Sequence, residues 1–201
     1  AENNTLGYSG TNAGGNLHVV NSEWTGNRVG MVPNTLDSEE LAPQRGAVFA
    51  GTWIHDNGNP DTPMRSEIWE LAWGIGLVLA GGNDNLVTRN LVENNDTGGI
   101  ATSLFFDDNL WLASNNTVSD NVLSGNEIDL VLLTDYDGLA GPVVLETEPG
   151  EPQVGADGNC FEGNTFTTSA PEDIETVAAC GGGTDPLVGV PPLTVALANS
   201  P

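Results

Sequence analysis

A short asparagine-containing phrase with an apolar centre returns at nearly regular intervals along the chain. Its copies occupy residues 21–27, 51–57, 90–95, 121–126 and, in a weaker form, 164–169. The first and the last asparagine of the third copy both recur 31 residues later, so two consecutive copies keep one register. Repeats with a period of roughly 20 to 50 residues are typical of solenoids, whose stacked units together bury an apolar face that none can bury alone. The repeat therefore predicts a stack of similar coils.

The segment between residues 85 and 102 shows how one coil is built. Short apolar pairs, such as Leu86 with Val87, alternate there with Asn, Asp and Gly. Asn tolerates left-handed backbone angles and Gly has no side chain to oppose them, so these residues form bends between short strands. Three brief strands with a bend after each predict an all-β fold, the right-handed parallel β-helix.

A β-sandwich is the competing fold, because it also combines short strands with glycine-rich turns. It predicts strands of roughly five to eight residues with alternating inward and outward side chains. The strands here are shorter and are interrupted by asparagine. The 26 glycines and 12 prolines of the 201-residue chain also favour turns and short strands over helices. The parallel β-helix is therefore the preferred interpretation.

Equivalent asparagines of stacked coils are expected one above another at the strand spacing, about 4.8 Å. At that distance their side-chain amides can form a hydrogen-bonded ladder, which removes the penalty for burying an unpaired amide. We therefore assign a structural role to one asparagine from each of four phrases: Asn27, Asn57, Asn95 and Asn126. The apolar residues at the centres of the phrases are expected to stack in the core: Trp24, Ile54, Val92, Leu123 and Phe166.

Four insertions interrupt the repeat, at residues 33–45, 58–73, 105–114 and 135–157. All are expected at one place, just after the strand that follows an asparagine phrase. Insertions at one repeat position of a solenoid emerge on one face, which is often the binding face, and here that face would be strongly acidic. Coils are thus predicted over residues 1–180, and the Gly- and Pro-rich segment 181–201 is expected to be a tail or an edge strand.

Paired carboxylates in two of these insertions can supply the oxygen ligands that Ca²⁺ prefers. They are Asp107 with Asp108 and Asp135 with Asp137. An Asp-rich exposed loop can equally be a solvated turn, and the chain has no complete calcium-binding loop with its terminal Glu. A Ca²⁺ site at these four residues is therefore one of two open interpretations.

The charge of the chain narrows the choice of partners. Its 28 acidic residues stand against four arginines and no lysine, which gives a formal net charge of −24. Phosphate binding requires a basic groove, so nucleic acid is not an expected partner. Such a surface suits a salty or cation-rich exterior, where counterions screen the self-repulsion, or else serves only to keep the protein soluble.

Cys160 and Cys180 are the two cysteines of the chain. In a secreted protein they would pair, and closing a loop of about twenty residues would stabilise the fold by about 3 kcal/mol. Two reduced, buried thiols are the alternative. The longest apolar stretch, residues 75–80, is too short to cross a bilayer, so no membrane span is expected. An exported chain would already have lost its signal peptide.

The phrase Asn-Asn-Thr-Val-Ser-Asp-Asn at residues 115–121 resembles the repeat unit of right-handed parallel β-helix proteins in the pectate-lyase-like superfamily. Four further segments are similar to secreted β-helix repeat proteins of bacteria: residues 3–16, 32–38, 42–46 and 158–166. The resemblance covers residues 2–180 and implies a secreted or cell-surface location. It also implies that the chain starts partway along a longer solenoid, because comparable coils usually precede this segment in such proteins.

Many proteins that this chain resembles are polysaccharide lyases, epimerases or hydrolases. Lyases and epimerases remove a proton beside a uronate carboxylate, which requires a base and a cation that stabilises the enediolate. The resemblance would assign this chemistry to His55, Arg65, Arg89 and Tyr136, next to Ca²⁺ on Asp107 and Asp108. His55 followed by Asp56 has the pattern of an oriented base, but its place within a phrase indicates a turn position instead.

The leading hypothesis is a secreted, non-catalytic β-helix that acts as a surface or matrix module and binds carbohydrate or divalent cations on an acidic loop face. A Ca²⁺-dependent polysaccharide lyase or epimerase is the first alternative, and a self-assembling structural protein is the second. The expected partners are therefore a polysaccharide or further copies of the chain. An enzyme would place an arginine and a carboxylate pair within reach of His55 or Tyr136, whereas a binding module would show exposed aromatic residues or bound cations without that arrangement.

Overall fold

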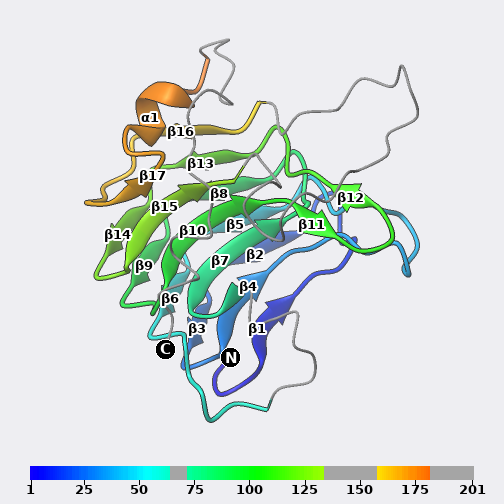
Figure 1. Ribbon diagram of the computed structural model, residues 1–201, viewed down its shortest axis with the longest axis horizontal. Helices are drawn as coiled ribbons and strands as arrows, with labels where there is room; N and C mark the ends of the chain where they lie inside the picture. Colours follow the sequence, from blue (N-terminus) through cyan, green and yellow to red (C-terminus); the bar gives the residue numbers. More distant parts are fainter. Residues whose placement is uncertain (64–71, 134–157, 182–201) are drawn as a thin grey trace, which may run out of the picture.

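Three parallel β-sheets form the sides of a coiled stack in the computed structural model of the chain, which describes residues 1–63, 72–133 and 158–181 (Figure 1). The six-stranded sheet has the order β1 (Leu6–Ser9), β4 (Val29–Val32), β7 (Ile75–Ala80), β10 (Gly98–Ser103), β15 (Ile128–Leu132) and β17 (Ser169–Ala170). The five-stranded sheet has the order β2 (His18–Val20), β5 (Val48–Ala50), β8 (Leu86–Thr88), β13 (Thr117–Ser119) and β16 (Cys160–Glu162). The four-stranded sheet has the order β3 (Glu23–Thr25), β6 (Trp53–His55), β9 (Leu91–Glu93) and β14 (Val122–Ser124).

Each full coil contributes one strand to each of the three sheets. Strands β8, β9 and β10 follow one another along the chain, and β13, β14 and β15 lie beside them in the next coil. Every strand pair within these sheets is parallel, with Val87 opposite Val118, for example. This arrangement confirms the predicted parallel β-helix. It excludes a β-sandwich, whose neighbouring strands are joined by antiparallel hairpins.

The chain bends between the sheets at three corners, and a residue with a left-handed backbone lies at each bend. The first corner, before the five-stranded sheet, has Gly46, Asp84, Asn115 and Gly158 in this position. The second, before the four-stranded sheet, has Asn21, Gly51, Arg89, Asp120 and Gly163. The third, before the six-stranded sheet, has Gly26, Asp56, Asn94 and Gly125. Gly, Asn and Asp tolerate this conformation better than other residues, which explains the composition of the repeated phrase.

Side-chain amides next to these bends form ladders through the stack; each asparagine directly follows its bend residue, whereas Gln44 lies two residues before Gly46. At the third corner each Nδ2 donates to the Oδ1 of the next coil, over 3.1, 2.8 and 3.0 Å, along Asn27, Asn57, Asn95 and Asn126. Two further ladders were not predicted. One runs through Asn90, Asn121 and Asn164 at the second corner, and the other through Gln44, Asn85, Asn116 and Asn159 at the first. These bonds satisfy the buried amides and fix the register of the coils.

The interior of the stack holds a continuous apolar core. Among the residues expected there, Ile54, Val92 and Leu123 are at most 2% exposed. Trp24 and Phe166 are partly buried against the same cluster. The middle residue of each short strand in the four-stranded sheet therefore points inward, which directs the two flanking residues outward.

The C-terminal end of the described stack is covered by helix α1 (Ile174–Val177), as Figure 1 shows. Ile174 is fully buried in the core cluster. The Glu175 Oε1 atom accepts hydrogen bonds from the backbone N–H and the Nδ2 of Asn164, at 2.7 and 2.9 Å. It takes the place that the amide oxygen of a further coil would occupy. The predicted disulfide between Cys160 and Cys180 joins β16 to the segment after the helix.

Two insertions emerge at the first corner. Segment 33–45 follows β4, and segment 105–114 follows β10 and contains the antiparallel pair β11 (Phe105–Phe106) and β12 (Leu110–Trp111). The insertion at 58–73 differs from the expectation, because it begins after β6 and ends before β7, at the third corner. Its position follows from Asn57, which already belongs to the ladder, so the chain leaves the coil before the next strand. Segments 135–157 and 182–201 lie outside the described residues.

None of the helices in the described part of the chain has the length and apolar character needed to cross a membrane.

Candidate functional site

The outer surface of the four-stranded sheet carries the most distinctive group of side chains among the described residues. We call it the four-strand face, and it consists of the outward residues Glu23, Thr25, Trp53, His55, Leu91, Glu93, Val122 and Ser124. The strand register places them in two rows that run along the stack. One row is Glu23, Trp53, Leu91 and Val122, and the other is Thr25, His55, Glu93 and Ser124.

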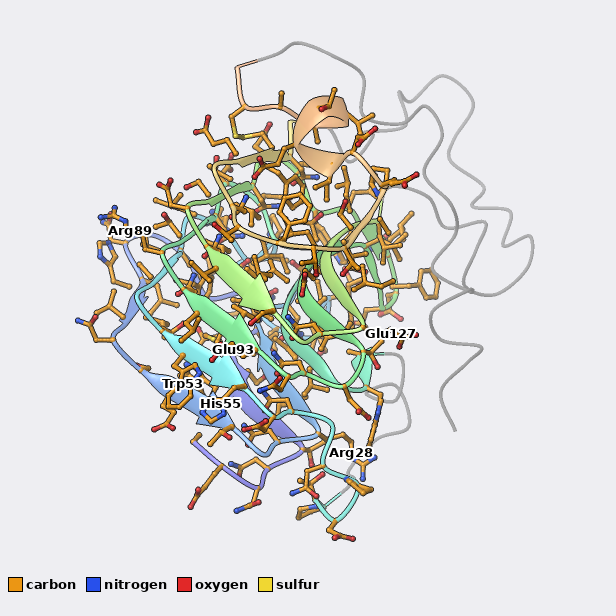
Figure 2. All side chains as sticks on the ribbon, turned by 90° about the vertical axis from the view of Figure 1, so that its left-hand side faces the viewer. Arg28, Trp53, His55, Arg89, Glu93 and Glu127 are labelled. Carbon is orange, nitrogen blue, oxygen red and sulfur yellow. A yellow bond between two sulfur atoms is a disulfide. The ribbon has the colours of Figure 1, made fainter. Side chains whose placement is uncertain are left out.

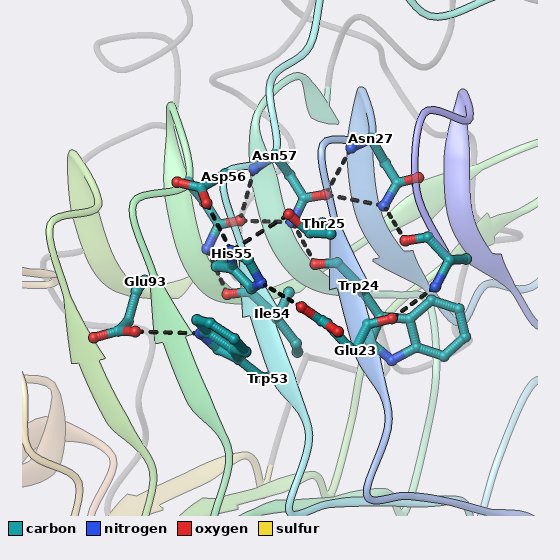
Figure 3. A network of polar contacts seen from close by, with 12 residues as sticks. Glu23, Trp24, Thr25, Asn27, Trp53, Ile54, His55, Asp56, Asn57 and Glu93 are labelled. Carbon is teal, nitrogen blue, oxygen red and sulfur yellow. Dashed lines mark hydrogen bonds and ion pairs between the residues drawn. The ribbon is translucent and has the colours of Figure 1, made fainter.

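Trp53 lies at the centre of this face and is held on two sides (Figure 3). Its ring stacks on the His55 imidazole, with centroids 3.8 Å apart and an interplanar angle of 22°. Its Nε1 donates a hydrogen bond of 3.2 Å to Oε2 of Glu93 on the next strand. Trp53 nevertheless remains 43% exposed. The indole is thus a solvent-facing ring in a fixed orientation.

His55 is enclosed by polar groups on both ring nitrogens (Figure 3). Its Nδ1 lies 2.7 Å from Oδ2 of Asp56 and its Nε2 lies 3.1 Å from Oε1 of Glu23. Both carboxylate side chains are more than half exposed, whereas the imidazole is largely buried. A neutral imidazole has one N–H, so both contacts can be hydrogen bonds to carboxylates only when the ring is doubly protonated.

This geometry does not form a nucleophilic triad. In such a triad the hydroxyl and the carboxylate contact opposite nitrogens of the histidine. Here the Thr25 hydroxyl, 3.3 Å from Nδ1, and the Asp56 carboxylate approach the same nitrogen. The second nitrogen faces Glu23, so His55 presents neither nitrogen to a substrate. In the described structure its ring stacks on that of Trp53.

A lyase would need an arginine next to His55, and the described candidate, Arg89, does not lie there. Arg89 is exposed at the second corner, where the strands of the four-stranded sheet begin. His55 is the last residue of β6, at the other end of these strands. Figure 2 shows Arg89 well apart from Trp53 and His55. The two other candidates, Arg65 and Tyr136, lie outside the described residues.

A second arginine forms a separate structural contact near the third corner. The Arg28 guanidinium lies 4.9 Å from the centre of the Trp73 ring and donates to the Pro60 carbonyl at 2.8 Å. The Trp73 Nε1 donates to Oδ2 of Asp96 at 3.0 Å. These bonds attach the ends of the 58–73 insertion to the coils, so they explain Arg28 as a structural residue.

Asp107, a predicted Ca²⁺ ligand, takes part in a clasp between two insertions. Its Oδ2 accepts the backbone N–H of Asp37 at 2.8 Å, while the Asp37 carboxylate accepts the backbone N–H and the Nδ2 of Asn109 at 2.7 and 2.8 Å. The bonds from Asn109 hold the pKa of the Asp37 carboxyl below its usual value. The clasp fastens segment 33–45 to the β11–β12 hairpin.

The proposed calcium ligands are only partly covered by the structure. Asp108 is exposed on the same hairpin, and Asp135 and Asp137 lie outside the described residues. Within the ranges that the structure describes, no group of three or more His, Cys, Asp or Glu side chains has a geometry that could hold a metal ion. The Ca²⁺ site therefore stays a prediction.

Sequence reasoning singled out His55 on this face and missed Glu23 and Trp53, which contact it, and Glu93, which contacts Trp53. A usable signal was present. Ile54 was expected in the core, and in a strand the residues on either side of an inward residue point outward. Trp53 and His55 are those residues, so an exposed aromatic pair could have been predicted.

Comparison with protein-family models, with curated proteins and with solved structures gave no match. Any inference about the function therefore has to be made from the geometry of the four-strand face.

Proposed function

We propose that this protein is a non-catalytic, secreted or cell-surface β-helix module that binds polysaccharide on the four-strand face. The observation that carries the proposal is Trp53, an exposed indole held in place by His55 and Glu93. A flat aromatic ring can stack on the apolar face of a sugar, and carboxylate oxygens can accept hydrogen bonds from its hydroxyl groups. The location is supported by the disulfide, which is typical of oxidising compartments.

Fixed orientation makes Trp53 suited to binding. A side chain that is already ordered loses little freedom when a ligand arrives, so more of the contact energy appears as affinity. The flexible Glu93 side chain contributes to this order by accepting the indole N–H. We therefore assign the Trp53–His55 stack as the central contact for one sugar ring.

The apolar row extends the contact along the stack. Leu91 and Val122 lie in register with Trp53 on the next two strands and are 37% and 46% exposed. Parallel strands are spaced by about 4.8 Å, which is comparable to the length of one sugar ring. A linear glycan that follows this row would place successive sugars over successive coils.

The lyase or epimerase alternative requires a base and an enediolate-stabilising cation next to the substrate. On the four-strand face His55 is occupied by Glu23 and Asp56, and Arg89 lies at another corner. These positions favour binding over catalysis. The likeness to pectate-lyase-like proteins is compatible with a polysaccharide ligand and does not by itself supply a reaction.

Self-assembly through stacked ends is the remaining alternative. At the C-terminal end of the described stack, α1 covers the core and Glu175 occupies the position of a further ladder oxygen. Another copy would have to displace both to continue the coils there. This cap favours a binding module over a filament.

The proposal is tested by affinity electrophoresis in gels that contain neutral, uronate or amino-sugar polymers. We expect at least one polymer to retard the wild-type protein and Trp53→Ala to weaken that retardation by about tenfold or more. Phe106→Ala is the matched control, because this aromatic residue is 41% exposed on the hairpin, away from the four-strand face. Equal retardation of Trp53→Ala and wild type would sink the proposal, as would a wild type that no polymer retards.

The same polymers are incubated with the protein, with and without Ca²⁺, and scanned for unsaturated products. If such products appear, the protein is a lyase and the proposal of a non-catalytic binding module is wrong.

A further inference from the structure

The charges around Trp53 are nearly all of one sign. Glu23, Asp56 and Glu93 surround the stacked rings, while the four strands of the face contain neither arginine nor lysine. His55 can supply at most one positive charge, which it directs at Glu23 and Asp56. The N-terminal ammonium of Ala1 donates to the backbone carbonyl of Glu23 at 2.7 Å, and with this charge and a protonated imidazole the three carboxylates still leave the patch negative.

Positive side chains elsewhere in the described chain do not offset this charge. Arg89 lies at the second corner, and Arg45 donates to the carbonyls of Leu41 and Pro43 on the 33–45 insertion. Arg28 is bound to the carbonyl of Pro60. The whole chain has a formal net charge of −24, so the long-range field at this face has the same sign as the local one.

Two carboxylate oxygens beside Trp53 accept no hydrogen bond from any residue that the structure describes. Glu23 uses Oε1 for His55, and Asp56 uses Oδ2 for the same ring. Both side chains are more than half exposed, so Oε2 of Glu23 and Oδ1 of Asp56 can each accept an N–H from a ligand. Hydrogen bonds between an ammonium group and a carboxylate are stronger than those from a neutral hydroxyl or amide.

From these observations, and resting on the proposed polysaccharide binding, we infer that the ligand of the four-strand face is a cationic glycan, a polymer of sugars with free, protonated amino groups. The ammonium groups pair with Glu23, Asp56 and Glu93, and the sugar rings stack on Trp53 and the apolar row. Because Glu23, Asp56 and Glu93 lie on three successive coils, amino groups on neighbouring sugars can be bound together.

Other ligand classes fit this face less well. A uronate polymer would bring carboxylates against carboxylates, which is unfavourable and more so at low ionic strength. A neutral or N-acetylated glycan can stack on Trp53 but gains nothing from the surrounding charge. Divalent cations would need converging ligands, and among the described residues no metal-binding group is present.

The test compares three oligomers of equal length: glucosamine, its N-acetylated counterpart and galacturonate. Binding is measured by calorimetry at a pH at which the amine is protonated, in low and in high salt. We expect the glucosamine oligomer to bind at least about tenfold more tightly than the N-acetylated one, as one charge-assisted hydrogen bond would give. This preference should shrink in high salt, while the galacturonate oligomer should bind weakest.

Isosteric variants assign the preference to this face. Glu23→Gln and Glu93→Gln should each reduce the preference for the glucosamine oligomer over the N-acetylated one several-fold, because each removes one carboxylate charge from the face. Glu127→Gln removes the same charge from a position that Figure 2 shows apart from Trp53, and it should keep the full preference. Trp53→Ala should weaken the binding of both oligomers.

The outcomes separate the two proposals. A wild-type protein that binds none of the oligomers or longer polymers overturns the binding function itself. Equal or reversed affinity for the glucosamine and N-acetylated oligomers overturns the cationic ligand but leaves polysaccharide binding in place. A preference that Glu127→Gln loses as much as Glu23→Gln does would reflect overall charge and would overturn the assignment to the four-strand face.

Discussion

At the scale of single residues, the stability of an amide ladder depends on the residue that accepts its last hydrogen bond. The Asp129 side chain receives Nδ2 of Asn126, the last amide of the third-corner ladder, at 2.9 Å. It also accepts the backbone N–H and the hydroxyl of Thr167 at 2.8 and 2.9 Å, from the following coil. Asp129 therefore links two coils. Its buried charge stabilises the fold only because these donors form hydrogen bonds with it.

Asp129 should make the protein sensitive to acid. Burial alone would raise the pKa of its carboxyl, but hydrogen bonds from Asn126, Thr167 and Thr168 outweigh burial and hold it below the usual value. A lowered pKa stabilises the fold above the unfolded-state pKa, about 3.9, and this stability is lost as the pH falls through the folded-state value. We expect Asp129→Asn to lower the free energy of unfolding by about 1–3 kcal/mol at neutral pH.

The measurement is urea unfolding of wild type and Asp129→Asn at neutral pH and near pH 3. The difference between the two proteins should shrink on acidification, because below about pH 3.9 the unfolded wild-type chain binds a proton at Asp129 that the folded carboxyl resists. Glu127→Gln, at an exposed position two residues earlier, is the control and should change little at either pH. A difference that is the same at both pH values would show that the charge of Asp129 is not what stabilises the junction.

At the scale of elements, helix α1 is predicted to work through one side-chain oxygen. Glu175→Ala leaves the backbone N–H and the Nδ2 of Asn164 without their acceptor, which should lower the free energy of unfolding by about 1–2 kcal/mol. Glu175→Gln keeps an oxygen at this position and should recover most of the loss. Urea unfolding gives the energies, and hydrogen exchange should show faster exchange of the Asn164 amide in the alanine variant. Glu172→Ala, an exposed neighbour, is the control.

If Glu175→Gln is as unstable as Glu175→Ala, the cap depends on charge and not on a ladder-like oxygen. Unchanged exchange at Asn164 in the alanine variant would mean that α1 covers the core without ending the ladder.

The elements differ in how far the sequence predicts them. The repeated phrases predicted the coils, the third-corner ladder and the inward residues Ile54, Val92 and Leu123, because each is set by local bends and by alternation within a strand. The α1 cap and the clasp between segment 33–45 and the β11–β12 hairpin could not be predicted from the sequence. They join segments that share no repeat, such as Asn164 with Glu175. The side chains around the Trp53–His55 stack come from three different coils, so only the register of the sheet brings Glu23 to His55 and Glu93 to Trp53.

At the scale of the whole molecule, the net charge of −24 opposes folding through self-repulsion. The folded chain holds its carboxylates closer together than the unfolded chain does, so screening favours the folded state. The Debye length falls from about 30 Å at 0.01 M salt to about 8 Å at 0.15 M. We expect the free energy of unfolding to rise by about 1 kcal/mol or more over this range, as measured by urea unfolding in NaCl.

Calcium at matched ionic strength separates this general effect from a specific site. In the clasp, Asp107 already accepts the Asp37 N–H and Asp37 accepts two bonds from Asn109. Protein donors thus satisfy carboxylates that a Ca²⁺ ion would need. At the clasp we therefore expect no stabilisation by CaCl₂ beyond that given by NaCl of equal ionic strength. A bound ion would instead stabilise the fold in proportion to the logarithm of its concentration above the Kd. Such an additional increase at low CaCl₂, removed by Asp107→Asn, would establish the calcium site and contradict purely electrostatic screening.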